Sequence, residues 1–478
     1  MAANPTFAAW SAPRRSAPAR TLALSAAALV AAFLVARGLS GAFVDDVHPH
    51  EAVILAFIAA MIGAGLAYLG LFRAVPGLAD DRRTLAAAFL VGLALRVAFF
   101  GSTPIYEDDW NRYLWDGAVV AAGIDPYAHA PADASPVDAF GARAPATDDP
   151  SLQTLRGLAE ANSDLHARIN YPFVSTIYPP LAQAAFAAAH KIGPFDLDAW
   201  RLILLTADLA ALALLLSALK AEGRNRLWAL LYWWNPLLIL TAYNSGHMDL
   251  LLAPFLIAAL LWVRGGRPGL AALALAGAAA IKLWPLILAP VLFRRWRARP
   301  VILVQIAALL VGTSALLLAP MAIAFDPDRS GLSAFAQTWR VNTFLFPLIA
   351  AAADGFALDG DLWARRIVAL LVIAASLGLG LRGSTDHART AGMALAVTAC
   401  LFFLAPTGYP WYAVWLCVFL PFAPSLGVAA LAATLPLYYA RFYMSSYGAD
   451  AVFDAVLTPI QFGVPLALVA WEMRRRHG

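Results

Sequence analysis

The feature that most constrains this chain is a series of long apolar blocks, bounded by charged residues, Gly or Pro, that recurs along nearly its whole length. A helix needs roughly 20 mostly apolar residues to cross the hydrocarbon core of a bilayer, and many of these blocks approach that length. Of the 478 residues, 61% are apolar and only 13% are charged, against roughly 25% charged residues in soluble domains. The sequence therefore predicts an all-α, polytopic membrane protein that forms one integral membrane domain over residues 1–478.

The blocks predict about twelve transmembrane helices, whose boundaries are defined only to within several residues. The predicted spans are residues 21–40, 52–72, 84–101, 199–219, 227–244, 248–263, 300–320, 363–381, 390–405, 410–422, 426–443 and 455–472.

Basic residues indicate the orientation of these spans, because Lys and Arg collect in cytoplasmic loops. An Arg-rich leader precedes the first span without a small-residue cleavage site, which favours an uncleaved signal anchor. With the leader inside, alternate connections place the following basic residues in the cytoplasm: Arg73, Arg82, Arg83, Lys220, Arg224, Arg226, Arg264, Arg267, Arg294, Arg295, Arg297, Arg299, Arg382, Arg389, Arg474, Arg475 and Arg476. We expect an inner-membrane protein with both termini in the cytoplasm and its polar loops outside.

The apolar segment 269–293 is an exception, since both of its flanks are basic. A single crossing would place one basic cluster outside. A break at Lys282, with Pro285 and Pro290 weakening the second half, gives a re-entrant helical hairpin that enters and leaves on the cytoplasmic side. Lys282 then lies at its tip.

The net charge argues against a nucleic-acid partner, and the cysteine content argues against a disulfide framework. The balance of 34 Lys and Arg against 30 Asp and Glu gives a net charge of only +4, so we expect membrane lipid and no nucleic acid as a partner. Cys400 and Cys417 both lie inside apolar blocks, which predicts small buried side chains and no disulfide framework.

The richest polar motif lies just after the third predicted span, at residues 106–117 (YEDDWNRYLWDG). On a helix, one polar and aromatic face would hold Asp109, Arg112, Tyr113 and Asp116. Asp108 and Arg112 are spaced as an i,i+4 ion pair. A carboxylate at this depth can act as a general base if burial and a neighbouring acid raise its pKa. The alternative is a solvated helix start, because acids favour the first helical turn.

This motif opens a long segment, residues 102–198, that we expect outside the membrane. It holds an amphipathic helix at 106–122, a Pro/Ala/Asp-rich loop at 131–150 and a short Ala-rich helix at 180–191. Between the last two, the run NYPFVSTIYPP keeps the backbone extended, and its Tyr171 and Tyr178 are either interfacial anchors or sugar-stacking rings.

Two further ionisable sites lie near predicted membrane boundaries. His247 and Asp249 stand in a very short outer connection, which is either a capped turn or part of a substrate site; two candidate ligands do not make a metal site. Lys282 lies among apolar residues, where either snorkelling or an awaiting anion explains it. Phosphate is the anion we expect, with Arg340 as a second ligand. No cofactor is predicted; a divalent metal is an alternative that the residues do not support.

An aromatic cluster follows at residues 406–415. Trp411 and Tyr412 come directly after Pro410, and Trp415 follows one helical turn later. An aromatic belt at the outer interface explains such a cluster, and a groove for carbohydrate or lipid is the alternative.

Taken in order, the motifs YEDDWNRYLWDG, GIDPY, NYP…TIYPP, GHMD, KLWP and YPWYAVW resemble bacterial GT-C glycosyltransferases of the mannosyltransferase-like branch, over about residues 102–415. The resemblance implies a multi-pass enzyme that transfers a mannose-type hexose from a polyprenyl-phosphate donor to a glycolipid or glycan acceptor on the extracytoplasmic face. No nucleotide-binding fold is needed, and none is visible.

The resemblance also implies roles for individual residues. The family's external general base matches Asp109, four residues before Tyr113, with Asp108 as the fallback. The basic ligands of the lipid phosphate would be Lys282, His247 and Arg340, and Arg112 would orient the acids. The family usually carries its acid loop after the first span rather than the third, which makes Asp45 and Asp46 rivals, although no Arg-Tyr-Trp context follows them.

Two other classes of protein stay open. Twelve or so spans with intramembrane charge are also typical of a secondary transporter or lipid flippase, but such proteins usually show repeated halves, and this chain has no convincing internal repeat. A non-catalytic subunit of an envelope assembly is the third reading, against which the clustered carboxylates argue.

Overall fold

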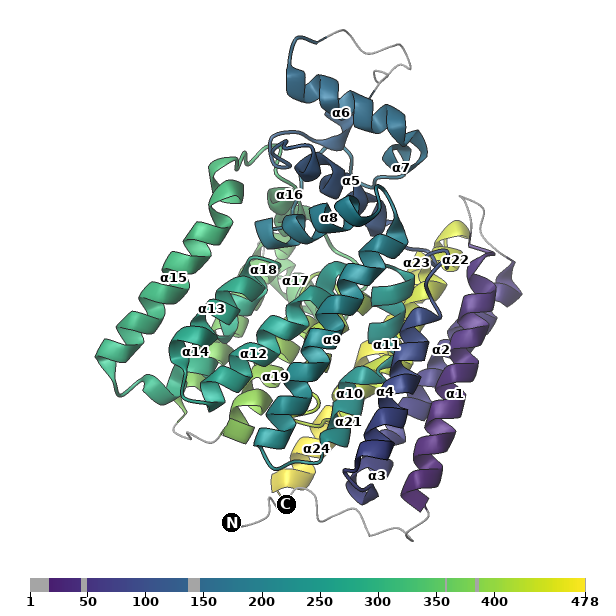
Figure 1. The fold of residues 1–478 in the computed structure, drawn as a ribbon, viewed down its shortest axis with the longest axis vertical. Helices are drawn as coiled ribbons and strands as arrows, with labels where there is room; N and C mark the ends of the chain where they lie inside the picture. Colours follow the sequence, from purple (N-terminus) through teal and green to yellow (C-terminus); the bar gives the residue numbers. More distant parts are fainter. Residues whose placement is uncertain (1–16, 44–49, 136–146, 357–358, 383–386, 478) are drawn as a thin grey trace. The chain divides into compact units, whose positions relative to one another are not determined.

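The computed structural model describes residues 17–43, 50–135, 147–356, 359–382 and 387–477. Within these ranges the chain is helical, with isolated β-bridges at Ser175–Ser330 and Val341–Thr407 and no β-strand. The all-α prediction is therefore confirmed (Figure 1).

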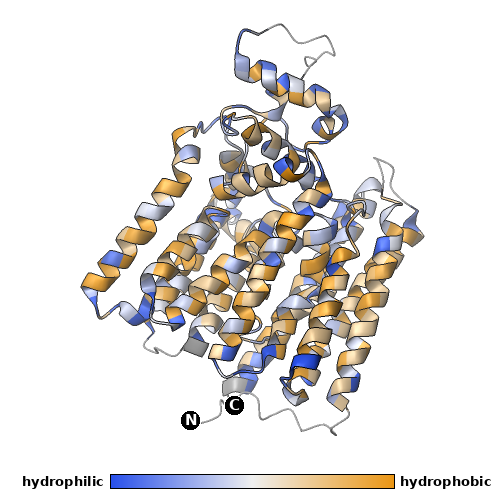
Figure 2. Cartoon of the chain, viewed as in Figure 1, coloured by the Kyte–Doolittle hydropathy of each residue, from blue (hydrophilic) through white to orange (hydrophobic). Residues whose placement is uncertain are grey.

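Six helices of the described chain are long and apolar enough to cross a membrane. These candidate spans are α1 (Ala17–Ser40), α2 (Glu51–Leu69) with its extension to Gly77, α9 (Leu197–Ala221), α15 (Pro300–Ile323), α18 (Gly360–Leu381) and the segment Asp450–Arg475 that includes α24 (Thr458–His477). The number becomes seven if the bent pair Pro236–Asn244 and Met248–Arg264 is one span. These helices are largely hydrophobic in Figure 2, as a membrane-embedded protein requires.

The prediction of about twelve spans is not confirmed, because several expected spans are divided into short helices. Pro lacks the backbone N–H that an interior helical position needs. Accordingly, the expected spans 227–244, 410–422 and 426–443 contain new helical starts at Pro236 and Pro410 and a 3₁₀ turn around Pro436.

The chain divides into two compact units. Unit 1 comprises Met1–Tyr106, Ala211–Asn244 and Val341–Gly478. In it, α2 packs against α1 and α21 (Leu426–Thr434), and α21 packs against α24. Gly65 allows the close approach of α2 to α21, since an added Cβ would lie 2.4 Å from the carbonyl oxygen of Ala432.

Unit 2 comprises Glu107–Ala210 and Ser245–Arg340. Here α5 (Asp109–Ala121) packs on α8 (Pro180–Ile192), and α13 (Pro268–Ala279) packs between α12 (Leu252–Arg264) and α15. Gly117 brings the backbone of α5 close to that of α8, because an added Cβ would lie 2.4 Å from the Phe186 carbonyl oxygen. A hydrogen bond of 2.9 Å from Leu181 N to Ala280 O joins the start of α8 to the end of α13.

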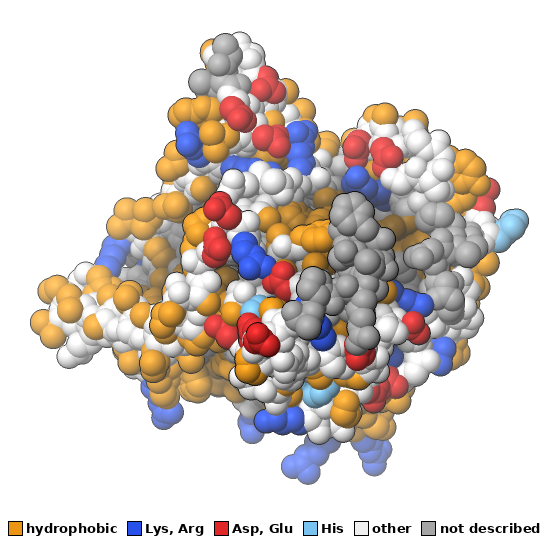
Figure 3. All heavy atoms as spheres, turned by 90° about the horizontal axis from the view of Figure 1, so that it is seen from above, with side chains coloured by type: hydrophobic (Ala, Val, Ile, Leu, Met, Phe, Trp, Pro, Cys, Tyr) orange, Lys and Arg blue, Asp and Glu red, His pale blue; other side chains and the backbone are white. Residues whose placement is uncertain are grey.

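The outward face of α15 shows why unit 2 needs an apolar environment. Val304, Leu316 and Ile323 are 67%, 75% and 85% exposed, and hydrophobic side chains cover the left edge of Figure 3, where α15 lies. Apolar surface of this extent along a 24-residue helix fits contact with lipid.

The predicted helices at 106–122 and 180–191 are present as α5 and α8. The loop expected at 131–150 is partly wrong. It opens with a 3₁₀ turn at Pro131–Ala134, and α6 (Pro150–Ala161) begins at its end. Asp149 caps α6 by accepting a hydrogen bond from Ser151 N, and α7 (Ser163–Ala167) follows. Residues 136–146 lie outside the described chain.

The break expected at Lys282 is present. Helix α13 ends at Ala279, and Lys282 follows in an irregular turn. The second half of the expected hairpin is not one helix but three short pieces: Trp284–Leu288, Ala289–Phe293 and Arg294–Trp296. Pro285 and Pro290 each stand near the start of a piece, which accounts for this fragmentation.

Candidate functional site

The site begins at the N-terminus of α5, where three consecutive residues carry carboxyl groups: Glu107, Asp108 and Asp109. Two side chains of the first helical turn fix the backbone there. Trp110 Nε1 donates to the Glu107 carbonyl at 3.1 Å, and Asn111 Nδ2 donates to the Asp108 carbonyl at 3.0 Å. The backbone that carries the three carboxyl groups is thereby fixed.

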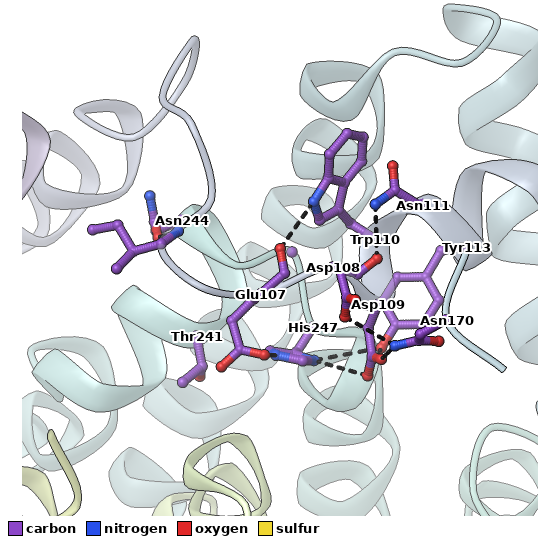
Figure 4. A network of polar contacts seen from close by, with 12 residues as sticks. Glu107, Asp108, Asp109, Trp110, Asn111, Tyr113, Asn170, Thr241, Asn244 and His247 are labelled. Carbon is purple, nitrogen blue, oxygen red and sulfur yellow. Dashed lines mark hydrogen bonds and ion pairs between the residues drawn. The ribbon is translucent and has the colours of Figure 1, made fainter. Parts of the chain in front are cut away.

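Asn170 holds two of these acids together. Its Nδ2 donates to Asp108 Oδ1 at 2.9 Å and to Asp109 Oδ1 at 2.8 Å (Figure 4). One amide group that serves two carboxylates stabilises their ionised forms and limits their movement. The sequence analysis missed Asn170, whose only local signal is its place before a Tyr-Pro pair.

His247 lies between two acids, with Glu107 on one side and Asp109 on the other (Figure 4). His247 Nε2 is 3.4 Å from Glu107 Oε2, and its Nδ1 is 3.7 Å from Asp109 Oδ2. The Tyr113 hydroxyl lies 3.4 Å from Asp109 Oδ2 and 3.5 Å from His247 Nδ1. Glu107, whose side chain is 6% exposed, is a member of the site that the sequence analysis did not single out.

The neighbouring Gly246 positions His247. Gly246 has a φ of +75°, which favours glycine, and an added Cβ would lie 3.3 Å from a methyl group of Leu197. Its carbonyl oxygen accepts a hydrogen bond of 2.6 Å from Trp200 Nε1. Contact with Leu197 and the hydrogen bond from Trp200 thus fix the backbone at Gly246, immediately before His247.

Lys282 forms an ion pair with Asp249, with 2.6 Å between Nζ and Oδ1. The Asp249 side chain is 1% exposed and that of Lys282 is 23% exposed. An aspartate of the adjacent short connection thus supplies one anionic partner of Lys282, and phosphate binding by this lysine stays a prediction. Sequence reasoning selected both residues but did not pair them.

The acids at the start of α5 have raised pKa values. Burial raises the pKa of Asp109, while the Asn170 hydrogen bond and the Lys282 charge act in the opposite direction. Burial, followed by the charges of Asp109 and Asp108, holds the pKa of Glu107 well above its usual range. Asp108 is more open to solvent, but partial desolvation and the Asp109 charge raise its pKa to about 6.

The Lys282 charge that acts on Asp109 links the two halves of the site, although these residues are far apart in the sequence. Unit 2 therefore brings together Asp109, Tyr113, His247, Asp249 and Lys282, all of which the sequence analysis selected.

Arg112 and Asp116 belong to a second, fully buried cluster. Arg112 Nε lies 2.8 Å from Asp116 Oδ1. Asp116 Oδ2 accepts from Thr176 Oγ1 at 2.5 Å and from Gln183 Nε2 at 3.0 Å. The predicted Asp108–Arg112 pair is therefore wrong: Asn170 holds Asp108, and Arg112 turns inward to Asp116 and the Val174 carbonyl. This cluster joins α5, the 170–178 segment and α8.

The two predicted tyrosines have different environments. Tyr178 packs edge-on against Tyr113 and Phe186, with ring centroids 5.1 and 5.6 Å apart. Tyr171 is 55% exposed and contacts Trp339. Tyr178 therefore supports the ring of Tyr113, whereas Tyr171 is open to a ligand.

The remaining candidates are placed as follows. Arg340 is exposed beyond the C-terminus of α16 (Gly331–Thr338). Trp411 and Tyr412, in unit 1, are 6% and 7% exposed and stack on Tyr409 and Trp415, each pair at 4.3 Å. Such packing is typical of core residues, and a role in binding substrate stays a prediction. Asp45 and Asp46 lie outside the described residues.

The described residues include no group of three or more His, Cys, Asp or Glu side chains that could hold a metal ion. The cluster contains a partly buried carboxylate with a raised pKa, oriented by an amide, a hydroxyl and an imidazole, next to a lysine that is partly exposed. A carboxylate in such surroundings is suited to accept a proton from a bound hydroxyl.

Residues 176–407 match the model of glycosyltransferase family 87. The match indicates glycosyltransferase activity. It includes His247, Asp249 and Lys282 and begins after the acids of α5. No curated protein and no solved structure gives a significant match.

Proposed function

We propose that the protein is an inverting glycosyltransferase that moves a mannose-type hexose from a polyprenyl-phosphate donor to a lipid or glycan acceptor on the extracytoplasmic face of the inner membrane. One observation carries the proposal beyond the family match. A partly buried aspartate oriented by three polar side chains lies within the electrostatic reach of a lysine, which gives a base and a cation in one site.

In the proposed reaction, Asp109 takes the proton of the acceptor hydroxyl as its oxygen attacks the anomeric carbon of the donor sugar. The new C–O bond forms opposite the breaking bond to the phosphate oxygen, so that the configuration inverts. The electron pair of the broken bond leaves with the polyprenyl phosphate, and Lys282 offsets the added negative charge. The proton stays on Asp109 until the product departs.

The neighbours of Asp109 suit this role. Asn170 occupies Oδ1, while Tyr113 and His247 stand on the side of Oδ2. This arrangement keeps the carboxylate in one orientation, as positioned acid–base catalysis requires. A pKa raised by burial makes Asp109 a stronger base than a solvated aspartate.

Lys282 is suited to the phosphate although it already pairs with Asp249. An ammonium group has three N–H donors, and the side chain is 23% exposed, so it can be approached from outside. Asp249 fixes the direction of the ammonium, which supports its use as a preorganised cation.

The proposal is tested with the full-length protein in proteoliposomes, a radiolabelled polyprenyl-phosphate mannose and a panel of mannosylated acceptors. Asp109→Asn should lower the transfer rate by about 10²–10⁴-fold, the usual contribution of a general base. The matched control is Asp164→Asn, which alters an exposed aspartate of α7. Retention of most activity in Asp109→Asn removes Asp109 from the role of base. Absence of transfer by the wild type to every acceptor contradicts the donor class.

A further inference from the structure

A group of aromatic side chains that includes the neighbour of Asn170 has no part in the reaction described above. Tyr171 contacts Trp339, with ring centroids 4.2 Å apart, and Trp339 contacts Phe335 at 5.7 Å. We call Tyr171, Trp339 and Phe335 the aromatic platform. Its members come from the 170–178 segment and from α16 with the residue that follows it.

The platform is built by the backbone as well as by its rings. Ser175 N donates to Arg329 O at 2.9 Å, and Gly331 N donates to Ser175 O at 3.2 Å. Gly331 permits this approach, because an added Cβ would lie 2.5 Å from the Ser175 carbonyl oxygen. The loop that carries Tyr171 is therefore joined to the start of α16.

Tyr171 itself is held in a costly conformation. Its φ is +48°, in the left-handed region that residues with a side chain seldom adopt, and it precedes Pro172, which restricts its backbone further. A strained residue persists only where the surrounding structure enforces it, and such residues cluster at ligand sites. Tyr171 is nevertheless 55% exposed, so burial of its ring does not explain the strain.

The platform also adjoins the proposed base. Asn170, the residue before Tyr171, binds both Asp108 and Asp109. The charges of these two acids act on the Tyr171 hydroxyl and, after burial, are the further causes that raise its pKa. Tyr171 is thus close to the carboxylates in the sequence, and their charges act on its hydroxyl group.

The negative charges of Asp108 and Asp109 limit which part of a substrate can bind at the aromatic platform. A phosphate group next to two carboxyl groups would be repelled, and so would anionic lipid headgroups. A neutral polyhydroxyl ring meets no such penalty: its C–H face packs on an aromatic ring, and its hydroxyl groups can reach polar side chains nearby.

We propose that the aromatic platform is the acceptor subsite, in which a pyranose ring of a neutral glycan stacks on Tyr171 and Trp339 and turns a hydroxyl toward Asp109. The inference rests on the proposed glycosyltransferase and names its acceptor as a molecule that already carries a sugar. An earlier glycosyl transfer must therefore supply the substrate, and this enzyme extends a glycan.

The test separates binding from transfer. Equilibrium binding of mannotetraose, galactotetraose, maltotetraose and an alkyl mannoside is measured on the full-length protein in detergent, without any donor. Tyr171→Ala should weaken binding of at least one of these by about tenfold, since an aromatic stacking contact is worth of order 1 kcal/mol. Tyr171→Phe, which keeps the ring, should bind as the wild type does. Tyr447→Ala, at an exposed tyrosine of unit 1, is the matched control.

The same experiment shows whether the acceptor sugar belongs to a glycan chain or to a glycolipid. Binding of a free tetrasaccharide identifies a glycan chain, whereas binding of the alkyl mannoside alone identifies a glycolipid. In the transfer assay, Tyr171→Ala and Trp339→Ala should raise the KM for the acceptor and leave that for the donor unchanged.

Two results would overturn the acceptor subsite: no binding of any probe to the wild type, or equal binding by Tyr171→Ala and the wild type. Each can occur while Asp109-dependent transfer is normal. Conversely, absence of transfer with Tyr171-dependent sugar binding would refute the proposed reaction and keep the subsite.

Discussion

Helix α5 carries two polar clusters that differ in one informative respect. The cluster of Arg112, Asp116, Thr176 and Gln183 is buried and joined by bonds of 2.5–3.0 Å. In the cluster around His247, the contacts that His247 and Tyr113 make with the acids are 3.4–3.7 Å long, although Asn170 and Lys282 bind their aspartates at 2.6–2.9 Å, and the Asp109 side chain is 25% exposed. Short, closed networks hold a fold together, whereas longer contacts that are open to solvent leave capacity for a substrate. The same helix thus serves as scaffold on one side and as a reactive surface on the other.

Removal of the cation from the closed cluster should have the largest effect on stability. Arg112→Met would leave the Asp116 carboxylate buried without its partner, a change that typically costs about 3–5 kcal/mol. The unfolding midpoint in detergent should fall clearly, while molecules that remain folded at low temperature still transfer sugar. An unchanged midpoint would show that the closed cluster does not stabilise the fold.

Removal of the cation from the open cluster should instead affect donor use. Lys282→Met is expected to lower kcat/KM for the polyprenyl-phosphate donor by roughly 10–100-fold, because a charge-assisted contact is worth about 1.5–3 kcal/mol. Lys282→Arg keeps the positive charge and is the control. If donor kinetics are the same in Lys282→Met and the wild type, the lysine only neutralises Asp249.

A pH profile can sharpen the contrast further. Asp109 must be ionised to accept a proton, so kcat/KM should fall as the pH drops through its pKa. Asn170→Ala removes a hydrogen bond that favours the ionised form, which raises that pKa and moves the acidic limb to higher pH. The limb should not move in Gln183→Ala, which alters the closed cluster. An unshifted limb in Asn170→Ala would assign it to another group.

The smallest effect is expected from Tyr113→Phe. The Tyr113 hydroxyl is 3.4 Å from Asp109 and 3.5 Å from His247, so each contact is weak. We expect kcat to fall by only about two- to tenfold, as for a single neutral hydrogen bond, with no change in the acceptor KM. A loss as large as that of Asp109→Asn would mean that the hydroxyl itself takes part in proton transfer.

The sequence predicted the polar helix correctly but not which of its residues belong to which cluster. Spacing placed Asp109, Arg112, Tyr113 and Asp116 on one face, yet the structure assigns two of them to each cluster. The partners that decide this assignment, Asn170, Thr176 and Gln183, lie about 60 residues further along the chain. Helical periodicity reports local neighbours only and carries no information on such contacts.

The same reason explains the other successes and failures. The break at Lys282 was predictable because its flanking charges and prolines are local signals. Its pairing with Asp249 was not, since it depends on how α13 packs against α12, which follows the turn that carries Asp249. The count of about twelve spans is not confirmed because hydropathy registers an apolar block whether or not prolines divide it into short turns.

The hydrogen bond from Leu181 to Ala280 has a mechanical consequence. It joins α8, on which α5 packs, to the turn that carries Lys282. The helix that packs on α5 and the turn that carries Lys282 are therefore joined through main-chain atoms, which limits how far the base and the cation can separate. Because donor and acceptor are both main-chain atoms, side-chain substitutions other than Leu181→Pro leave this bond in place.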